Sequence, residues 1–276
     1  MTTLGLHSPL LQPVRELRTK AGRRDQGRFA IEGPTLLAEA LAAGLRPLAV
    51  YVTAAGHATF TTPAPGQAAL PASAGLDDVL FVIPDRAMER LSDLESPPGI
   101  LAVFPLRQAG LDEVLADGAP GIVLAGVSDP GNAGTLLRSA EIFGFSGAAF
   151  LGDAVEPYNP KVVRASMGAI FRLRLATATP AELVAAARRA GYSLVAAASD
   201  GEPLPEFRFA PRSLIAIGHE RHGVTPYLPQ VDHTVAIPQR GAGESLNAAV
   251  AGSIVFYAFS QRLGAEVAAP KTPRKP

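Results

Sequence analysis

The stretch IPQRGAGESLNAAVAGSIVFYAFSQR, residues 237–262, decides how this chain folds. It begins at the end of a short apolar run, residues 234–237, which predicts a buried strand that a proline then stops. Two glycines permit a tight loop, and apolar residues at helical spacing follow Ser245, which we predict as the N-cap. The order strand, glycine loop, helix places free backbone amides of a helix N-terminus against whatever the loop holds.

Composition describes a globular chain of 276 residues, with 47% hydrophobic and 18% charged residues, long enough for two domains. No apolar window approaches the roughly 18 residues of a membrane helix, so we expect no membrane partner. The first twenty residues lack a signal-peptide pattern, which predicts a cytoplasmic protein. The absence of cysteine excludes disulfides and cysteine-ligated metals.

Charge is balanced overall, with 25 Lys plus Arg and 25 Asp plus Glu, and such a balance counts against nucleic acid as a partner. Its distribution is uneven. Residues 15–28 hold six cations against two acids, and this segment is either a local phosphate-binding patch or a solvated helix face. The cations are Arg15, Arg18, Lys20, Arg23, Arg24 and Arg28.

The first hundred residues alternate between predicted helices and strands, which indicates a compact α/β unit. We expect a helix over residues 8–22, with Ser8 as its cap and Gly22 at its end. Residues 54–75 are rich in Ala, Pro, Thr and Gly and predict a long surface loop. The other expected elements are strands at 29–31, 48–53, 80–83 and 100–104 and helices at 34–43 and 85–92.

From residue 121 onward, short apolar runs again alternate with helical patterns, which predicts a mostly parallel sheet with helices on both faces. The expected strands are 121–127, 148–151, 194–197 and 214–217, with an extended segment at 170–175. The expected helices follow residue 135 as far as Phe143, then occupy 159–165 (or a turn) and 180–190.

Two common functional motifs are considered and set aside. The loop over residues 129–135 joins a strand to a helix through glycines, yet it lacks the G-x-G-x-x-G of dinucleotide-binding proteins. His219 and His222 are one residue short of the H-E-x-x-H zinc-protease spacing, and only His233 offers a further ligand. We therefore expect no metal.

Four segments together resemble a known family. They are similar to the motifs of SpoU/TrmH-class SPOUT RNA 2′-O-ribose methyltransferases. The four segments are DPGNAGTLLRSAEIFG at 129–144, NPKVVRASMGA at 159–169, IAIGHERHGV at 215–224 and the Pro238–Asn247 region. The segment from Arg23 to Gly33 resembles the start of the substrate-binding domain that precedes many of their catalytic domains. Arg221 departs from the pattern, because many members have glycine there.

The resemblance implies a fold that periodicity alone does not reveal. We expect a small, ribosomal-protein-like α/β RNA-binding domain over residues 1–105, a linker over 106–119, and a SPOUT α/β-knot domain over 120–264. This second domain would carry a mostly parallel sheet and a trefoil knot near its C-terminus. Residues 265–276 are predicted to be a disordered tail.

The resemblance also implies methyl transfer from S-adenosyl-L-methionine to a ribose 2′-hydroxyl of RNA, rRNA in preference to tRNA, by a homodimer. Its residue assignments are these: catalytic Arg138, Asn132, Glu220, Ser245 and Asn247; cofactor-binding Gly218, Ile237 and Leu246; RNA-binding Arg23, Arg24, Arg28, Lys161 and Arg164. Arg138 acts either as a base or as a clamp that positions the substrate. The dimer contact is expected along the apolar helix over residues 246–259.

Two alternatives stay open at this point. A non-catalytic RNA-binding protein with a SPOUT fold would bind RNA without transferring methyl groups, and a nucleotide-binding oxidoreductase would turn over a reduced cofactor. The sequence does not identify the target nucleotide, nor whether methylation confers antibiotic resistance.

Overall fold

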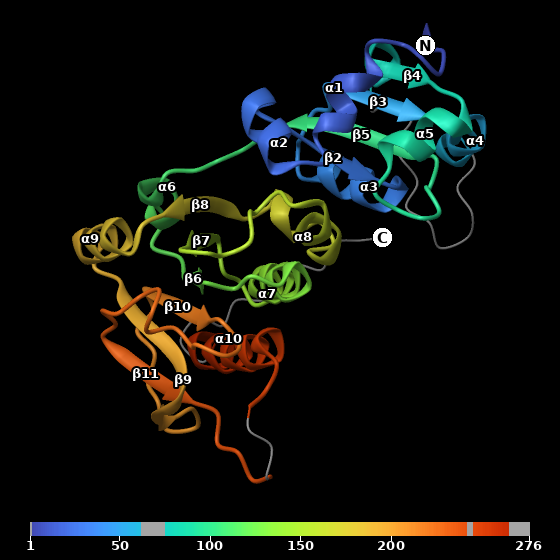
Figure 1. The fold of residues 1–276 in the computed structure, drawn as a ribbon. Helices are drawn as coiled ribbons and strands as arrows, with labels where there is room; N and C mark the ends of the chain where they lie inside the picture. The colour runs from blue at the N-terminus through green and yellow to red at the C-terminus, as the bar shows by residue number, and fades with distance from the viewer. Residues whose placement is uncertain (1, 62–74, 242–244, 265–276) are drawn as a thin grey trace. The chain divides into compact units, whose positions relative to one another are not determined.

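The computed structural model describes residues 2–61, 75–241 and 245–264 of the chain (Figure 1). These residues form two compact units. The first comprises Met1–Gln108 together with Glu156–Arg172, and the second comprises Ala109–Val155 together with Leu173–Pro276. The division differs from the boundaries expected at 105 and 120, because residues 156–172 belong to the first unit. The tail predicted over 265–276 lies outside the described residues.

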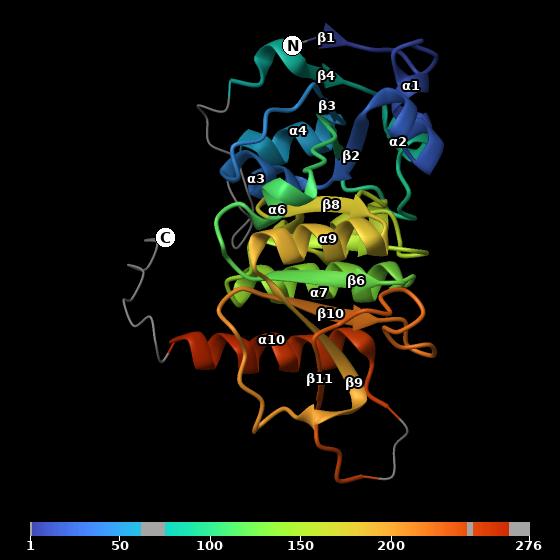
Figure 2. The same cartoon turned by 90° about the vertical axis from the view of Figure 1, so that its left-hand side faces the viewer.

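The first unit is built on a five-stranded mixed sheet with the order β1-β4-β3-β5-β2. Strand β5 pairs antiparallel with β2 and with β3. Strand β4 pairs parallel with β3 and, at the sheet edge, with β1 (Figure 2). The strands are β1 (Thr2–Thr3), β2 (Arg28–Glu32), β3 (Ala49–Val52), β4 (Leu80–Val82) and β5 (Ile100–Pro105).

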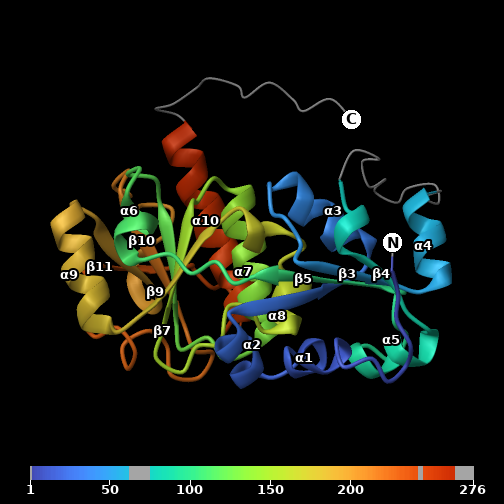
Figure 3. The ribbon, with the colours of Figure 1, turned by 90° about the horizontal axis from the view of Figure 1, so that it is seen from above.

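Helices cover both faces of this sheet. On one face α1 and α5 share a core with β3 and β5, and α3 and α4 pack against β2 and β3 (Figure 3). The helices are α1 (Leu11–Glu16), α2 (Lys20–Gln26), α3 (Pro34–Ala42), α4 (Ala54–Thr61) and α5 (Asp85–Leu91).

Two predictions about the first unit are wrong. The helix expected over residues 8–22 is two helices, because Thr19 adopts an extended backbone and its side chain accepts a hydrogen bond from the Gly22 N–H, which starts α2. Gly22 thus lies inside α2. The loop expected over 54–75 begins with α4, and residues 62–74 lie outside the described part of the chain.

The segment Glu156–Arg172 completes the first unit. It contains α8 (Pro160–Ala165) and a short 3-10 turn, Ala169–Phe171, and α8 contacts β2. The Phe29 ring lies 4.6 Å from that of Tyr158 and 6.3 Å from that of Phe171, measured between centroids. Burial raises the pKa of Tyr158 to about 12, so its hydroxyl stays protonated and donates to the Arg107 carbonyl.

The second unit contains a six-stranded sheet in which every described pairing is parallel, with the order β11-β9-β10-β6-β7-β8. Both faces of a parallel sheet are covered by helices. Its strands are therefore buried on both sides and consist of continuous apolar runs. The strands are β6 (Gly121–Ala125), β7 (Gly147–Leu151), β8 (Arg174–Ala178), β9 (Ser193–Pro203), β10 (Ser213–Gly218) and β11 (His233–Ala236).

Figure 3 shows α6 and α9 on one face of this sheet and α7 and α10 on the other. Helix α10 approaches α7 and β10 closely because Gly252 has no side chain; a Cβ there would overlap the Leu136 side chain. The helices are α6 (Leu111–Leu115), α7 (Pro130–Ile142), α9 (Pro180–Ala190) and α10 (Ala248–Gly264). The mostly parallel sheet is confirmed; the extended segment expected at 170–175 begins only at Arg174.

Candidate active site

The site lies at the carboxyl edge of the parallel sheet. Asn132 follows β6, Glu220 follows β10 and Asn247 follows β11, three strands that run in the same direction. In open α/β sheets the loops after the strand ends gather at this edge, where ligands bind. Residues more than a hundred positions apart in sequence therefore meet.

Asn132 is held at the start of α7 by a cap. The Asp129 carboxylate accepts a hydrogen bond from the Asn132 backbone N–H at 2.7 Å, and Pro130 occupies the first helical position. Both features favour helix initiation, because the carboxylate satisfies a free amide and proline needs no donor there. Asp129 is a positioning residue that our sequence reasoning missed, although Asp-Pro before a helix is a recognisable cap signal.

A chain of side-chain hydrogen bonds joins the three loops. The Asn247 Nδ2 donates to the Asn132 Oδ1 at 2.9 Å, and the Asn132 Nδ2 donates to the Glu220 Oε1. At its other end, the Asn247 Oδ1 accepts the backbone N–H groups of Ala249 at 2.9 Å and Val250 at 3.2 Å. The chain thus runs from the N-terminus of α10 to a carboxylate.

This network fixes the orientation of both amides. Because the Asn247 oxygen is used by the helix amides, only its nitrogen can donate to Asn132. The Asn132 oxygen is then occupied, which leaves its nitrogen to donate to the Glu220 carboxylate in a charge-assisted bond. The same contacts correct the predicted N-cap: α10 begins at Ala248 and Asn247, not Ser245, caps it.

The loop that carries Glu220 requires glycine at both ends. A Cβ on Gly218 would overlap the backbone of Gly223, and Gly223 itself has a φ of +66°. Two backbone hydrogen bonds between His219 and Gly223, of 3.2 and 2.9 Å, close the loop. A side chain at Gly218 would therefore displace the loop that carries Glu220, while the cofactor-binding role of Gly218 stays a prediction.

The predicted cofactor residues lie on the same edge. Gly218 ends β10, the half-buried Ile237 follows β11, and Leu246 precedes α10 with 41% of its surface exposed. An exposed leucine and a carboxylate at the same edge of the sheet fit the two parts of S-adenosylmethionine, an apolar adenine face and a cationic sulfonium. Residues 242–244 of the intervening loop lie outside the described residues.

Arg138 is exposed, and within the described residues its side chain makes no hydrogen bond or ion pair. It lies six residues after Asn132 on α7, which corresponds to about 9 Å along the helix and a different face. The structure brings Asn132, Glu220 and Asn247 together but does not join Arg138 to them within one chain. Ser245 is exposed beside this cluster without a recorded side-chain partner in the described part.

The predicted RNA-binding residues all belong to the first unit and differ in their surroundings. Arg28 and Lys161 are exposed, Arg164 is half-buried, and Arg24 is exposed and paired with Asp25 at 3.0 Å.

The prediction for Arg23 is wrong. Its side chain is 3% exposed and paired with Glu156, and its Nη1 donates to the carbonyls of Leu17 and Arg18 at 2.8 and 3.1 Å. A guanidinium with its donors used inside the fold cannot bind a phosphate. This pairing could not be predicted from sequence, because Glu156 is 133 residues away from Arg23.

Among the described residues, no group of three or more His, Cys, Asp or Glu is arranged to hold a metal ion. The rings of His219 and His222 instead pack against one another at a tilt, with centroids 4.7 Å apart. No helix in the described ranges is long and apolar enough to cross a bilayer.

Comparison with known proteins places this geometry in a family. The model of the SpoU rRNA Methylase family matches residues 120–257, and that of the MRM3-like substrate binding domain matches residues 9–102. The chain is 33% identical over 199 residues to the 23S rRNA (uridine(2479)-2′-O)-methyltransferase of Streptomyces viridochromogenes, which covers 68% of this chain and 69% of that one.

Two further similarities extend over nearly the whole chain. An uncharacterized tRNA/rRNA methyltransferase of Synechocystis sp. is 29% identical over 91% of this chain and 90% of its own. The structure of the SpoU methyltransferase AviRb from Streptomyces viridochromogenes in complex with the cofactor AdoMet matches with a TM-score of 0.78 and 25% identity, covering 93% of this chain and 98% of that one. With its sheet-edge cluster of Asn132, Glu220 and Asn247 and both family matches, the chain belongs to the SpoU rRNA methylase family.

Proposed function

We propose that the protein transfers a methyl group from S-adenosylmethionine to a ribose 2′-hydroxyl of rRNA in the cytoplasm. The observation that carries this proposal is the hydrogen-bonded chain from Asn247 through Asn132 to Glu220, which assembles three of the five predicted catalytic residues. The family match supports the reaction, and so do the names of two relatives, each a 23S rRNA 2′-O-methyltransferase; these two names also favour rRNA over tRNA.

Different residues would bind the cofactor, hold the carboxylate and orient the RNA. Gly218, Ile237 and Leu246 would hold S-adenosylmethionine, which supplies an electrophilic sulfonium methyl group when bound. The Asn132–Glu220 bond holds the Glu220 carboxylate at the edge of the sheet, where a nearby negative charge favours a cationic donor. Arg138 would orient the RNA, with its guanidinium clamped on a phosphate and the 2′-oxygen held in line for attack.

A direct test is incubation of the protein with methyl-labelled S-adenosylmethionine and rRNA transcribed in vitro. We expect label in RNA that alkaline hydrolysis leaves as an undigested dinucleotide, because a 2′-O-methyl group blocks cleavage of the adjacent phosphodiester. RNA binding without label transfer would instead support the non-catalytic alternative. Labelling of tRNA but not rRNA would overturn the substrate class alone.

We also propose that the protein acts as a homodimer through α7 and α10. Val250, Ile254 and Tyr257 recur at helical spacing on α10 and are 49%, 37% and 51% exposed, and Ile142 on α7 is 62% exposed. An apolar stripe of this kind on a soluble protein is typical of an interaction surface. The two helices are joined by a 2.7 Å Ser139–Ser253 hydrogen bond, so they present one continuous face.

The proposed dimer face also accounts for the position of Arg138 on α7. Arg138 precedes Ile142 by four residues and therefore shares its side of α7. A second copy seated on the apolar stripe would cover Arg138 and bring it against the partner's sheet edge. The separation of Arg138 from Asn132 within one chain supports this arrangement.

Replacement of Ile254 by aspartate is expected to convert the dimer to a monomer, because a charge would be buried in an apolar interface. Sedimentation velocity should show wild type at twice the chain mass of 28.6 kDa and the variant at 28.6 kDa. Leu48→Asp is a matched control, since Leu48 is 44% exposed but belongs to the first unit. A monomeric wild-type protein would contradict the proposal.

A further inference from the structure

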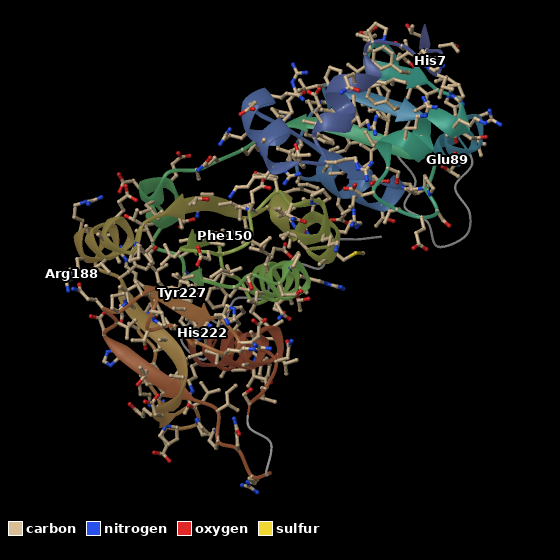
Figure 4. The ribbon with its side chains drawn as sticks, viewed as in Figure 1. His7, Glu89, Phe150, Arg188, His222 and Tyr227 are labelled. Atoms are coloured by element: carbon tan, nitrogen blue, oxygen red, sulfur yellow. The ribbon has the colours of Figure 1, made fainter. Side chains whose placement is uncertain are left out.

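Three aromatic rings form a column beside the active-site loop. His222 packs against His219 in a tilted arrangement, with ring centroids 4.7 Å apart and planes inclined by 35°. His219 in turn lies parallel to Tyr227, at 6.4 Å and 18°. Figure 4 labels His222 and Tyr227, the two ends of this column, in the second unit. His219 and His222 lie within the 215–224 segment, but the reaction described above assigns no role to any of the three rings.

The inner end of the column is rigid. The Tyr227 ring is packed against Gly126 and Gly152, which follow β6 and β7, and a Cβ on either glycine would overlap it. Both glycines have positive φ, of +74° and +61°, so the backbone conformation and the lack of a side chain are needed together. Tyr227 is therefore seated in the strand ends of the sheet.

The middle ring is also fixed. His219 is tied to Gly223 by the two backbone hydrogen bonds that close the loop, and its Nδ1 accepts the Arg221 backbone N–H at 3.1 Å. Because Nδ1 is an acceptor, the proton of the neutral ring is on Nε2. A ring held at three points needs little further ordering when a ligand stacks on its neighbour.

The outer end of the column is free. His222 is exposed, and His219 is its one ring neighbour within the described residues. Arg221, next to it, is exposed and forms no side-chain hydrogen bond or ion pair in that same part of the chain. An exposed ring on an ordered stack, with an unpaired guanidinium beside it, offers the contacts that single-stranded RNA uses: a base stacks on the ring and a phosphate pairs with the arginine.

The column stands next to the reacting groups. Glu220 lies between His219 and His222 in sequence, and its carboxylate bonds to Asn132. We propose that His222 stacks a nucleobase of the RNA substrate, with Arg221 on an adjoining phosphate, so that this loop selects an unpaired nucleotide. The inference rests on the proposed function and deepens it, since it gives the substrate a single-stranded segment at the site of methylation.

The chain contains no tryptophan, so His222→Trp introduces a single fluorophore at the platform. Stacking of a base on the indole is expected to quench its emission when 23S rRNA transcribed in vitro is added. His233→Trp is a matched control, because His233 is also an exposed histidine of the second unit and contacts one ring, that of Phe207, at 5.6 Å. Equal quenching in both variants, or none in His222→Trp, overturns the proposal.

Quenching by S-adenosylmethionine alone, without RNA, would assign the platform to the cofactor and would also overturn the proposal. Steady-state kinetics supply a second measurement. We expect His222→Ala to raise the KM for RNA by about 10- to 100-fold, the usual effect of losing one base–aromatic stack. The KM for S-adenosylmethionine should not change, and His222→Phe should restore the KM for RNA.

The stacking inference and the proposed function fail in different ways. If wild type methylates rRNA but His222→Ala is kinetically unaltered, the inference is wrong and the function stands. If wild type methylates no RNA, the function is wrong, and RNA-dependent quenching of His222→Trp still decides whether the ring binds a base.

Discussion

Replacement of Arg138 by alanine is expected to lower the kcat for methyl transfer by on the order of 10³-fold while leaving the affinity for S-adenosylmethionine within about twofold. Arg138 is exposed and outside the Asn132–Glu220–Asn247 network, so its loss would remove the proposed RNA contact without disturbing the loops proposed to bind the cofactor. The size of the effect follows from its proposed task, because a misplaced 2′-oxygen cannot attack in line.

Arg138 is better suited to clamp a phosphate than to act as a base. An arginine that acts as a base would need its pKa lowered to near neutrality, which would cost several kcal/mol. Arg138→Lys should therefore keep partial activity, because lysine retains the positive charge that a phosphate clamp needs but not the planar fork of donors.

Single-turnover kinetics and calorimetric titration with S-adenosylmethionine distinguish these roles. Arg188→Ala is the matched control, because Arg188 is another exposed helical arginine of the second unit, on α9. The mass of Arg138→Ala should be checked by sedimentation, since the residue borders the proposed dimer face. Loss of donor binding in a folded Arg138→Ala dimer would contradict the assignment.

Replacement of Arg23 by alanine is expected to destabilise the first unit by about 3–5 kcal/mol, the cost of removing one partner of a buried ion pair. The guanidinium is 3% exposed, pairs with Glu156 and donates to the Leu17 and Arg18 carbonyls just beyond α1. Its loss leaves a carboxylate that is 17% exposed and two carbonyls without their donor.

Urea unfolding of the full chain, followed by circular dichroism, measures this effect. Arg24→Ala is an adjacent control: Arg24 is 77% exposed and pairs with an exposed Asp25, so its removal should change stability by less than about 0.5 kcal/mol. The double variant Arg23→Met/Glu156→Leu should recover much of the lost stability, because an apolar pair leaves no buried charge. Equal midpoints for Arg23→Ala and Arg24→Ala would show that the pair is not structural.

Much of the second unit could be predicted from sequence, since its signals are local. Gly121–Ala125 and Gly147–Leu151 are fully buried apolar strands, and buried parallel strands read as unbroken apolar runs. The family resemblance identified Asn132, Glu220 and Asn247, which the structure brings into one network. The trefoil knot stays a prediction, as do the dimer and the cytoplasmic location.

The failures arose where local rules compete. Ser245 and Asn247 are both acceptable caps, and the structure uses asparagine because its amide can cap α10 and donate to Asn132 at once. The single helix expected over residues 8–22 is interrupted at Thr19, whose side chain caps a new helix. The spacing of apolar residues predicts neither the cap at Asn247 nor the interruption at Thr19. The first depends on a hydrogen-bond partner, and the second depends on a local backbone turn.

The sequence by itself determined most strands of the parallel sheet, the glycine-bounded turns and the family, because strand runs, helical spacing and motif order are properties of neighbouring residues. Only the tertiary structure decided which charged side chains are buried in ion pairs and which are exposed to solvent. Arg23 and Arg24 are adjacent and chemically identical, yet one lies inside the first unit against Glu156 and the other lies in solvent. The free energy of a charge depends on its burial and its partners, and those are set by residues far away in the chain.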